Sequence, residues 1–210
     1  MKGFKRFQEL LKLNYSASQM GFKVGAAEIN RISARIKLAM AFKKLDLEGY
    51  KQDTEEAYAA LFKVFLTYSA FEQFLGIYDV EFYNLDQQFP DHDYLNISQE
   101  IRNKDKQGKF FDFIDEQLDS QRLKTRVSNF RTGTNFNPAN VAAAVRHVFA
   151  HGKLTPNANK SNPKVTISIC NILVNFLLNF MDVEFEKSIN QFYTQQEQVG
   201  FKQLKKRTSI

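Results

Sequence analysis

Apolar side chains recur every three or four residues along most of the chain, which is the spacing that places them on one face of an α-helix. This spacing predicts helices over residues 26–45, 54–78, 109–130 and 163–198. In residues 54–78 the apolar positions are so numerous that the helix is expected to be buried on more than one side. They comprise Ala57, Leu61, Val64, Tyr68, Phe71, Leu75 and Tyr78, with Phe62, Phe65 and Phe74 widening the apolar face.

Local sequence signals mark where helices begin and end. Residues 79–98 contain a proline and several Asp and Asn and lack the helical spacing, so we expect a long connection there. Asn137 followed by Pro138 predicts a helix start, because the Asn side chain can accept a hydrogen bond from the first turn and Pro has no N–H to leave unpaired. This helix should run to about His151 and end at Gly152, a residue suited to helix termination.

These elements predict an all-α protein, an up-and-down helical bundle with a long final helix. A chain of 210 residues is long enough to bury a sizeable core, and a hydrophobic fraction of 43% argues for a packed protein rather than a disordered one. We expect a single domain over residues 1–210, with its core at about residues 26–195 and basic tails at residues 1–12 and 201–210.

The net charge of +6 is concentrated at the two ends of the chain. Residues 1–12 and 201–210 together carry +7, so the residues between them carry about −1. Basic ends of this kind are usually solvated, and they lend RNA or membranes a weak, salt-sensitive attraction. The overall charge therefore gives little evidence on function.

The most apolar stretch, Val165–Met181, is slightly short for a membrane span. It carries Asn171, Asn175 and Asn179 on one face, which argues for a core helix, and we expect no membrane contact. These asparagines form either the wet face of a buried helix or a polar lining for a functional site or a dimer seam. Cys170 is the one cysteine and can form no intrachain disulfide, which fits a reducing, cytoplasmic setting.

Candidate chemistry is concentrated in Arg146, His147 and His151, which bring two of the three histidines within five residues of each other. An arginine can hold a phosphate and an imidazole exchanges protons near neutral pH, so together they are a minimal set for cleaving a phosphodiester without a metal ion. On a helix, His147 and His151 lie about 40° apart, whereas Arg146 and His151 lie about 140° apart. Arg146 and His151 therefore converge only if the last turn is loosened or if two copies of the helix meet.

Metal binding is the competing use of the histidines. The i, i+4 spacing of His147 and His151 suits two metal ligands on one helix face, but no third ligand is evident. His92 lies between Asp91 and Asp93 in the expected connection, where a metal site competes with an ordinary loop. Side chains adjacent in sequence rarely converge on one ion, so we expect no metal site.

A group of basic residues near the end of the predicted helix 109–130 also has two interpretations. The helix begins acidic and ends basic, a polarity that suits the helix dipole. The alternative is a basic stripe that faces RNA. The residues concerned are Arg122, Lys124, Arg126 and Arg131.

The sequence Arg146-His147-Val148-Phe149-Ala150-His151, followed by Gly152, resembles the Arg-x4-6-His signature of the HEPN superfamily. Those domains are helical bundles that carry the signature near a late connection between helices, commonly with a polar residue after the arginine. The helix order over residues 26–195 is similar as well. The resemblance implies a metal-independent endoribonuclease, of a kind found in toxin–antitoxin, abortive-infection and RNA-targeting defence systems.

On this resemblance, Arg146 would hold the scissile phosphate and stabilise its developing charge. His151 would act as general acid and base, and His147 would orient the other two side chains. Lys153 would bind the substrate together with Arg146. Some toxins of the superfamily carry, at the position of Lys153, a tyrosine that a partner nucleotidyltransferase modifies, so the lysine argues against that mode of neutralisation.

The resemblance also implies partners. RNA would be the substrate, two copies of the chain are expected to pair with Arg146 and His151 of each facing across a cleft, and an antitoxin or regulatory protein is a further candidate. No cofactor is expected. The alternative is a non-catalytic helical module for interaction or dimerisation, in which Arg146 forms a local ion pair and both histidines are ordinary helix-end residues.

Overall fold

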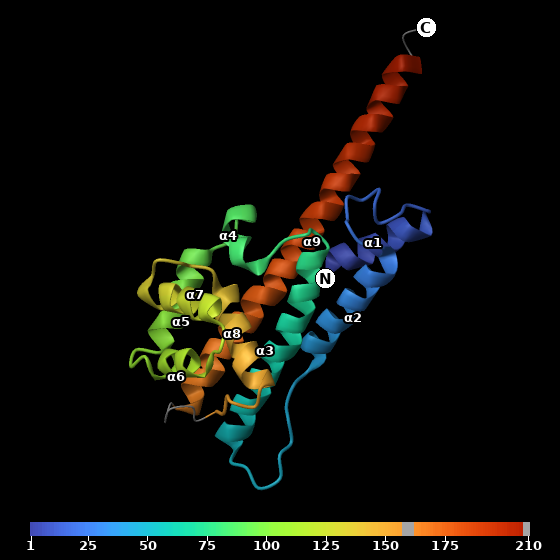
Figure 1. Cartoon of the computed structure of the whole chain (residues 1–210). Helices are drawn as coiled ribbons and strands as arrows, with labels where there is room; N and C mark the ends of the chain where they lie inside the picture. Colours follow the sequence, from blue (N-terminus) through green and yellow to red (C-terminus); the bar gives the residue numbers. More distant parts are fainter. Residues whose placement is uncertain (157–161, 208–210) are drawn as a thin grey trace.

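Helices form throughout the described part of the chain, and no strand occurs there (Figure 1). The computed structural model describes the backbone of residues 1–156 and 162–207, and the side chains of residues 1–156 and 162–196. The all-α prediction is therefore confirmed. The elements are α1 (Lys2–Lys12), α2 (Ala26–Ala41), α3 (Gln52–Gly76), the 3-10 helix η1 (Phe82–Asn84), α4 (Leu85–Gln88), α5 (Tyr94–Lys104), α6 (Lys109–Gln117), α7 (Gln121–Thr132), α8 (Pro138–Ala150) and α9 (Pro163–Arg207).

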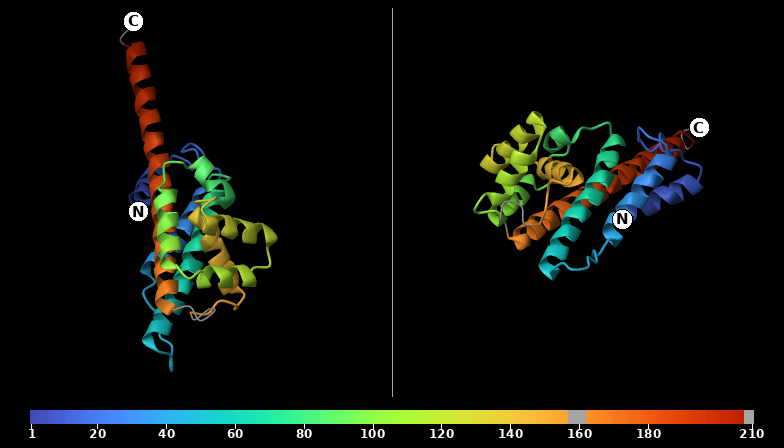
Figure 2. Two further views of the ribbon diagram at one scale, coloured as in Figure 1. Left: turned by 90° about the vertical axis from the view of Figure 1, so that its left-hand side faces the viewer. Right: turned by 60° about the horizontal axis from the view of Figure 1, so that its bottom comes forward.

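Helix α3 lies at the centre of the structure and packs against α9, α2 and α8. Figures 1 and 2 show α3 and α9 side by side and running in the same direction, with α2 on the side of α3 away from α8. The expectation that this helix is buried on more than one side is confirmed. Among its expected core positions, Phe62, Phe65 and Tyr78 are partly exposed and the others are buried.

The first twelve residues are not a solvated basic tail, because they form α1, which packs against α9. Phe4, Phe7 and Leu10 share one face of this helix and are buried. The Phe4 ring stacks on Phe185 of α9, with 3.8 Å between the ring centroids. The core therefore begins before residue 26, and the prediction of a tail at residues 1–12 is wrong because the apolar positions between the basic side chains have helical spacing.

The prediction of a long connection over residues 79–98 is also wrong, since this segment contains η1, α4 and the beginning of α5. Its polar residues cap helices rather than prevent them. The Asp93 carboxylate accepts a hydrogen bond from the Asn96 N–H at 3.2 Å and so starts α5.

The single helix expected over residues 109–130 is divided into α6 and α7. The backbone becomes extended at Leu118, and the Ser120 hydroxyl accepts a hydrogen bond from the Leu123 N–H at 3.3 Å, which starts α7. Leu118 is buried. The apolar spacing therefore continues across the break and conceals it.

Helix α9 continues to Arg207, further than the sequence predicts, and its last turns extend past the other helices (Figure 1). Its expected core positions Ile169, Leu173, Phe176 and Phe180 are buried, and Val183 is partly exposed. The side chains of the basic tail expected at residues 201–210 lie outside the described residues.

Asn171, Asn175 and Asn179 are all exposed on α9, so the asparagine stripe lies outside the core of this chain. By length and composition alone, Pro163–Gln196 could cross a membrane, but half of its most apolar window is buried inside the protein. A core helix passes the same test of length and composition.

Candidate functional site

Helix α8 carries the candidate site near its C-terminal end and is fixed at its N-terminal end by Asn137. The Asn137 Oδ1 accepts a hydrogen bond from the Ala139 N–H at 3.0 Å, which confirms the predicted cap. The Asn137 Nδ2 donates to the Phe82 carbonyl of η1 at 2.7 Å. Residues 138–145 are all buried, so packing on every side sets the position of α8. The motif is therefore presented by a rigid element.

Helix α8 ends at Ala150 with His151 as its cap, and Gly152 follows as the predicted terminating residue, in the left-handed region at φ +68°. The chain then reverses, and the N–H groups of Lys153 and Leu154 both donate to the Val148 carbonyl, at 3.1 and 3.3 Å. The Leu154 side chain is buried and anchors this turn. His151 lies at the junction and is exposed. The turn therefore holds His151 and Lys153 at the surface in a defined geometry.

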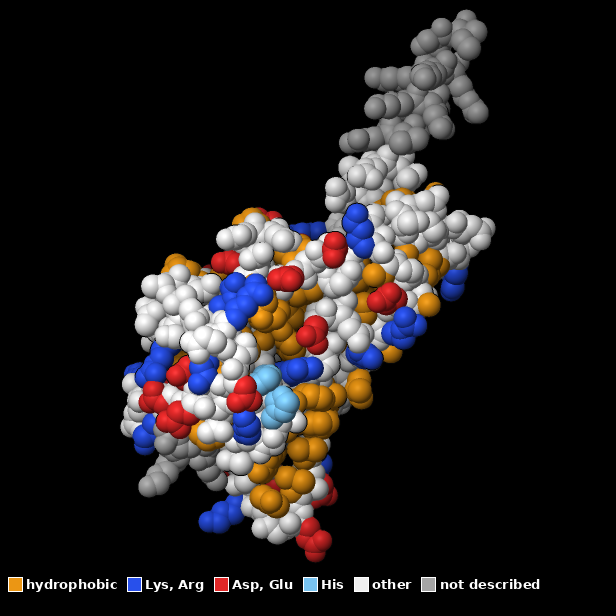
Figure 3. Space-filling view, viewed as in Figure 1, with side chains coloured by type: hydrophobic (Ala, Val, Ile, Leu, Met, Phe, Trp, Pro, Cys, Tyr) orange, Lys and Arg blue, Asp and Glu red, His pale blue; other side chains and the backbone are white. Residues whose placement is uncertain are grey.

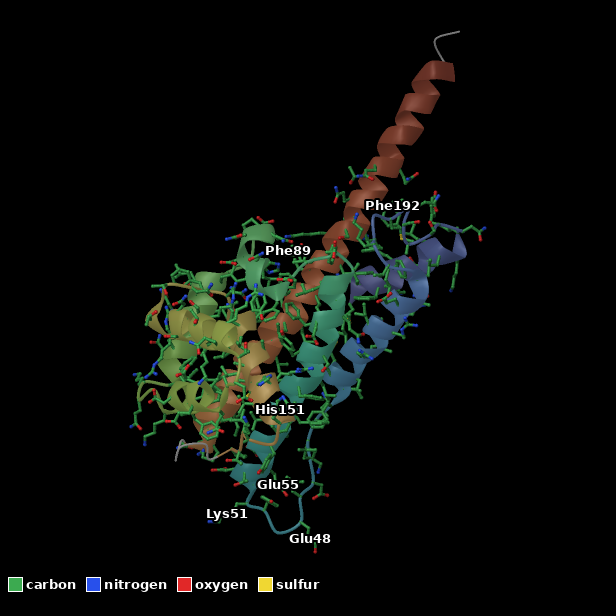
Figure 4. All side chains as sticks on the ribbon, viewed as in Figure 1. Glu48, Lys51, Glu55, Phe89, His151 and Phe192 are labelled. Atoms are coloured by element: carbon green, nitrogen blue, oxygen red, sulfur yellow. The ribbon has the colours of Figure 1, made fainter. Side chains whose placement is uncertain are left out.

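The His147 and His151 rings lie together, with 4.6 Å between their centroids and 56° between their planes. This confirms the proximity that their 40° separation on the helix predicts. His147 is partly buried, and its Nε2 is buried without a hydrogen-bond partner in the part of the chain that the structure describes. Figure 4 labels His151 at the end of α8, beside α3.

Arg146 points towards α3, where its Nη2 lies 3.9 Å from Glu72 Oε2. Its Nε is buried and has no hydrogen-bond partner among the described residues. No hydrogen bond or ion pair joins Arg146 to His151 within that part of the chain, in keeping with their 140° separation. His147 is the residue that lies between them.

Lys153 connects the end of α8 to the junction between α6 and α7. Its Nζ lies 3.0 and 3.3 Å from the two carboxylate oxygens of Asp119 and donates to the Gln117 carbonyl at 3.4 Å. The hydrogen bond and charge of Lys153 lower the pKa of the Asp119 carboxyl, and the nearby histidines contribute in the same direction. Sequence reasoning did not assign Asp119 to the site, because the break between α6 and α7 places it there.

Burial is the main cause that lowers the pKa of His147 below its ordinary value. The positive charges of His151, Arg146 and Lys153 lower it further, and only the nearby Asp119 acts in the opposite direction. The neutral form of His147 is therefore favoured at neutral pH, which makes this imidazole a proton acceptor.

An aromatic group adjoins the site on the side of η1. The Tyr68 ring of α3 is buried and contacts Phe82, with 6.0 Å between centroids. Burial raises the pKa of Tyr68 well above its usual range, and the charge of Glu72 raises it further, so this hydroxyl stays protonated.

In the space-filling view of Figure 3, the histidine side chains lie beside basic side chains near the centre of one face, with apolar surface next to them.

His92 does not form a metal site with its two neighbours. Its Nε2 lies 2.8 Å from Glu184 Oε1 of α9, while Asp91 pairs with Lys187 and Asp93 caps α5. Within the described residues, no group of three or more His, Cys, Asp and Glu side chains is arranged to hold a metal ion.

The candidate site does not coincide with the groove of about 650 Å³ at the start of α3. That groove is lined by residues of the loop after α2, the first half of α3 and two residues of α9, among them Lys43, Glu55 and Asn171. None of the motif residues lines it. The motif lies instead on an open face, which suits an extended substrate better than a small enclosed one.

No family model, curated protein or solved structure matches the chain. The resemblance to HEPN domains therefore depends on residues 146–151 and on the order of the helices around them.

Proposed function

We propose that this protein is a HEPN-like, metal-independent endoribonuclease whose site consists of Arg146, His147 and His151. The observation that supports this proposal is the electrostatic setting of the three side chains. Together with Lys153 they share one surface, and two buried polar atoms among them have no partner in the described part of the chain. Like-charged, partly desolvated groups are unfavourable for stability and favourable for binding an anion, which is typical of functional sites.

The chemistry follows from the different settings of the two histidines. Neutral His147 accepts the proton of a ribose 2′-hydroxyl as that oxygen forms a bond to phosphorus. The bond from phosphorus to the 5′ oxygen breaks, and His151 donates a proton to the leaving oxygen. The Arg146 guanidinium stabilises the charge on the remaining phosphoryl oxygens. The products are a 2′,3′-cyclic phosphate and a 5′-hydroxyl, and the step consumes no metal ion.

Arg146 must exchange its partner for this to happen. Its ion pair with Glu72 is 3.9 Å long and joins two side chains that are 36% and 56% exposed. Exposed pairs of this length contribute little to stability, so a phosphate can replace the carboxylate at small cost.

The decisive test is cleavage of total RNA by purified protein in the presence of EDTA. We expect wild-type protein to yield fragments ending in 2′,3′-cyclic phosphate, and Arg146→Ala and His151→Ala to cleave at least about 100-fold more slowly. Arg35→Ala, an exposed arginine on α2, is the matched control and should cleave at the wild-type rate. Cleavage that requires a divalent metal, or that survives both motif substitutions, would contradict the proposal.

We further propose that the active unit is a homodimer in which the motif helices of two copies face each other. Phe62 and Phe65 of α3 and Phe149 of α8 form a partly exposed aromatic strip beside His151, with 6.1 and 6.5 Å between successive ring centroids. An apolar strip next to the site is suited to a symmetric contact that unites two Arg146 and four histidine side chains. Light scattering at micromolar concentration should give twice the chain mass, and Phe65→Glu should give a monomer without cleavage activity. A wild-type monomer that still cleaves RNA would exclude the composite site.

The second candidate is a non-catalytic interaction module, and the ion pair between Arg146 and Glu72 favours it. In that case the aromatic strip binds a protein partner, such as an antitoxin or regulator, and the motif stabilises the end of α8. The cleavage test separates the two candidates.

A further inference from the structure

Two arginines are held against one tyrosine on the surface beside α8. The guanidinium carbons of Arg122 and Arg126 lie 3.9 and 4.2 Å from the centroid of the Tyr83 ring. Arg126 Nη1 also donates a hydrogen bond to the Tyr83 carbonyl at 3.2 Å. The Tyr83 ring in turn packs on Phe82, with 3.9 Å between centroids. We refer to Arg122, Tyr83 and Arg126 as the arginine–tyrosine stack.

The stack is connected to the start of the helix that carries the motif. The Phe82 carbonyl accepts a hydrogen bond from Asn137, the cap of α8, and the Phe82 ring contacts Tyr68. Arg146 follows Pro138 by eight residues, which is roughly 12 Å along the helix at 1.5 Å per residue. Figure 3 shows basic side chains on both sides of apolar surface on the face that bears the histidines.

Contact with the tyrosine prepares the arginines for binding an anion. A guanidinium that lies over an aromatic ring is held by its face, while its N–H edges remain available to donate. The Arg122 side chain is 60% exposed. Its ion pair with Glu81 is 3.7 Å long, and the Glu81 side chain is 69% exposed. Such a pair is weak, so it does not prevent a phosphate from binding. Because the side chains are already ordered, little conformational entropy is lost on binding.

We propose that the arginine–tyrosine stack binds a backbone phosphate of single-stranded RNA at a distance from the scissile phosphate. This inference rests on the proposed function, in which Arg146 holds the scissile phosphate. A strand that follows α8 from its start to Arg146 covers roughly 12 Å, which corresponds to about three or four nucleotides of a stacked strand, in which phosphates follow at about 3.4 Å along the axis. The stack thereby selects strands long enough to reach both positions.

The test is binding of a fluorescein-labelled single-stranded RNA of about 12 nucleotides, measured by fluorescence anisotropy on His151→Ala protein so that the strand stays intact. We expect Arg122→Ala/Arg126→Ala to bind about tenfold more weakly and to reduce the slope of log K against log salt by about 0.7, the value for one lost phosphate contact on a single strand. Arg31→Ala/Arg35→Ala on α2 removes the same charge from exposed positions and should leave both quantities unchanged. Tyr83→Leu should weaken binding, whereas Tyr83→Phe, which keeps the ring, should not.

Further measurements separate the stack from the proposed cleavage activity. With a labelled RNA of two nucleotides, which is too short to reach both positions, the double variant should lose less binding relative to His151→Ala than it does with the longer strand. Equal losses in the two double variants, or no loss in either, would overturn the inference, as would failure of His151→Ala to bind the longer strand. If wild-type protein binds in the expected manner but does not cleave, the proposed function fails and the binding surface remains. The single variant Arg122→Ala is the control for folding. Because this position is exposed, weaker RNA binding by the variant cannot be attributed to loss of the folded structure.

Discussion

His92 and His147 are both partly buried next to charged side chains, but the charges around them have opposite sign. His92 lies 2.8 Å from the Glu184 carboxylate, which also pairs with Lys187, and its ring packs on Phe180 with 4.5 Å between centroids. His147 lies among His151, Arg146 and Lys153, and its Nε2 has no hydrogen-bond partner in the described chain. In the first region a buried carboxylate pairs with the histidine, whereas in the second the carboxylates of Glu72 and Asp119 pair with Arg146 and Lys153 and none pairs with His147 in the described chain.

The consequence is a difference in what each region contributes. Burial opposes the charged form of Glu184, but the hydrogen bonds from His92 and Lys187 outweigh it and lower the pKa of the carboxyl. This contribution to stability is present above the ordinary carboxyl pKa and is lost as the pH falls through the lowered one. The setting of His147 instead disfavours its protonated form, which is the pattern expected where an anion binds. The first region stabilises the fold, and in the proposed function the second region would supply the chemistry.

The largest effect should follow from Glu184→Ala. The side chains of His92 and Glu184 are each 8% exposed, so removing the carboxylate leaves a buried imidazole without its acceptor, while Lys187 keeps only its exposed pair with Asp91. We expect a loss of about 3 kcal/mol in the free energy of unfolding, measured by urea denaturation at pH 7. Glu116→Ala, at an exposed position of α6, is the control and should change it by less than about 0.5 kcal/mol. Similar losses in both variants would remove the distinction between the two regions.

The second effect concerns pH and should be smaller. Because the pKa of His147 is lowered in the folded protein, the unfolded chain binds this proton more tightly, and protonation favours unfolding. Stability should therefore be full above the ordinary histidine pKa of about 6.5 and should decrease as the pH falls through the lowered value. Urea denaturation between about pH 7 and 5 should show this decrease in wild-type protein and a shallower one in His147→Asn. Equal slopes would mean that folding does not lower the pKa of His147.

Much of the fold around these two regions could be predicted from the sequence, because helix positions and helix ends depend on residues close together in the chain. Apolar spacing located α3, and the identities of Asn137 and Gly152 located the two ends of α8. The break before Ser120 and the packing of α1 were missed, because buried apolar residues continue through the first and basic residues surround the apolar face of the second.

From the sequence, only the part of the candidate site that lies on a single helix, α8, could be predicted. The proximity of His147 and His151 follows from their spacing and is present in the structure. The acidic partners Glu72 and Asp119 come from α3 and from the junction of α6 and α7, so their positions depend on tertiary packing. The same is true of the Glu184 partner of His92, which lies ninety-two residues away in the chain. Local patterns reveal the side chains that share a helix, and packing decides which charges meet them.

The smallest effect on stability, and the sharpest contrast with Glu184, should come from Glu72→Gln. The carboxylate is 56% exposed and 3.9 Å from Arg146, so its loss should change the free energy of unfolding by less than about 0.5 kcal/mol. RNA binding should improve, because the phosphate no longer competes with a negative charge at Arg146. An interaction of about 0.5–1 kcal/mol at this distance corresponds to roughly two- to fivefold tighter binding, measured by anisotropy on the His151→Ala background.

Glu48→Gln, at an exposed position that Figure 4 labels in the loop between α2 and α3, removes the same charge far from the motif and should have neither effect. If Glu72→Gln destabilised the protein as Glu184→Ala does, Arg146 would belong to the structural class of His92, and the interaction module would be the better description of this protein.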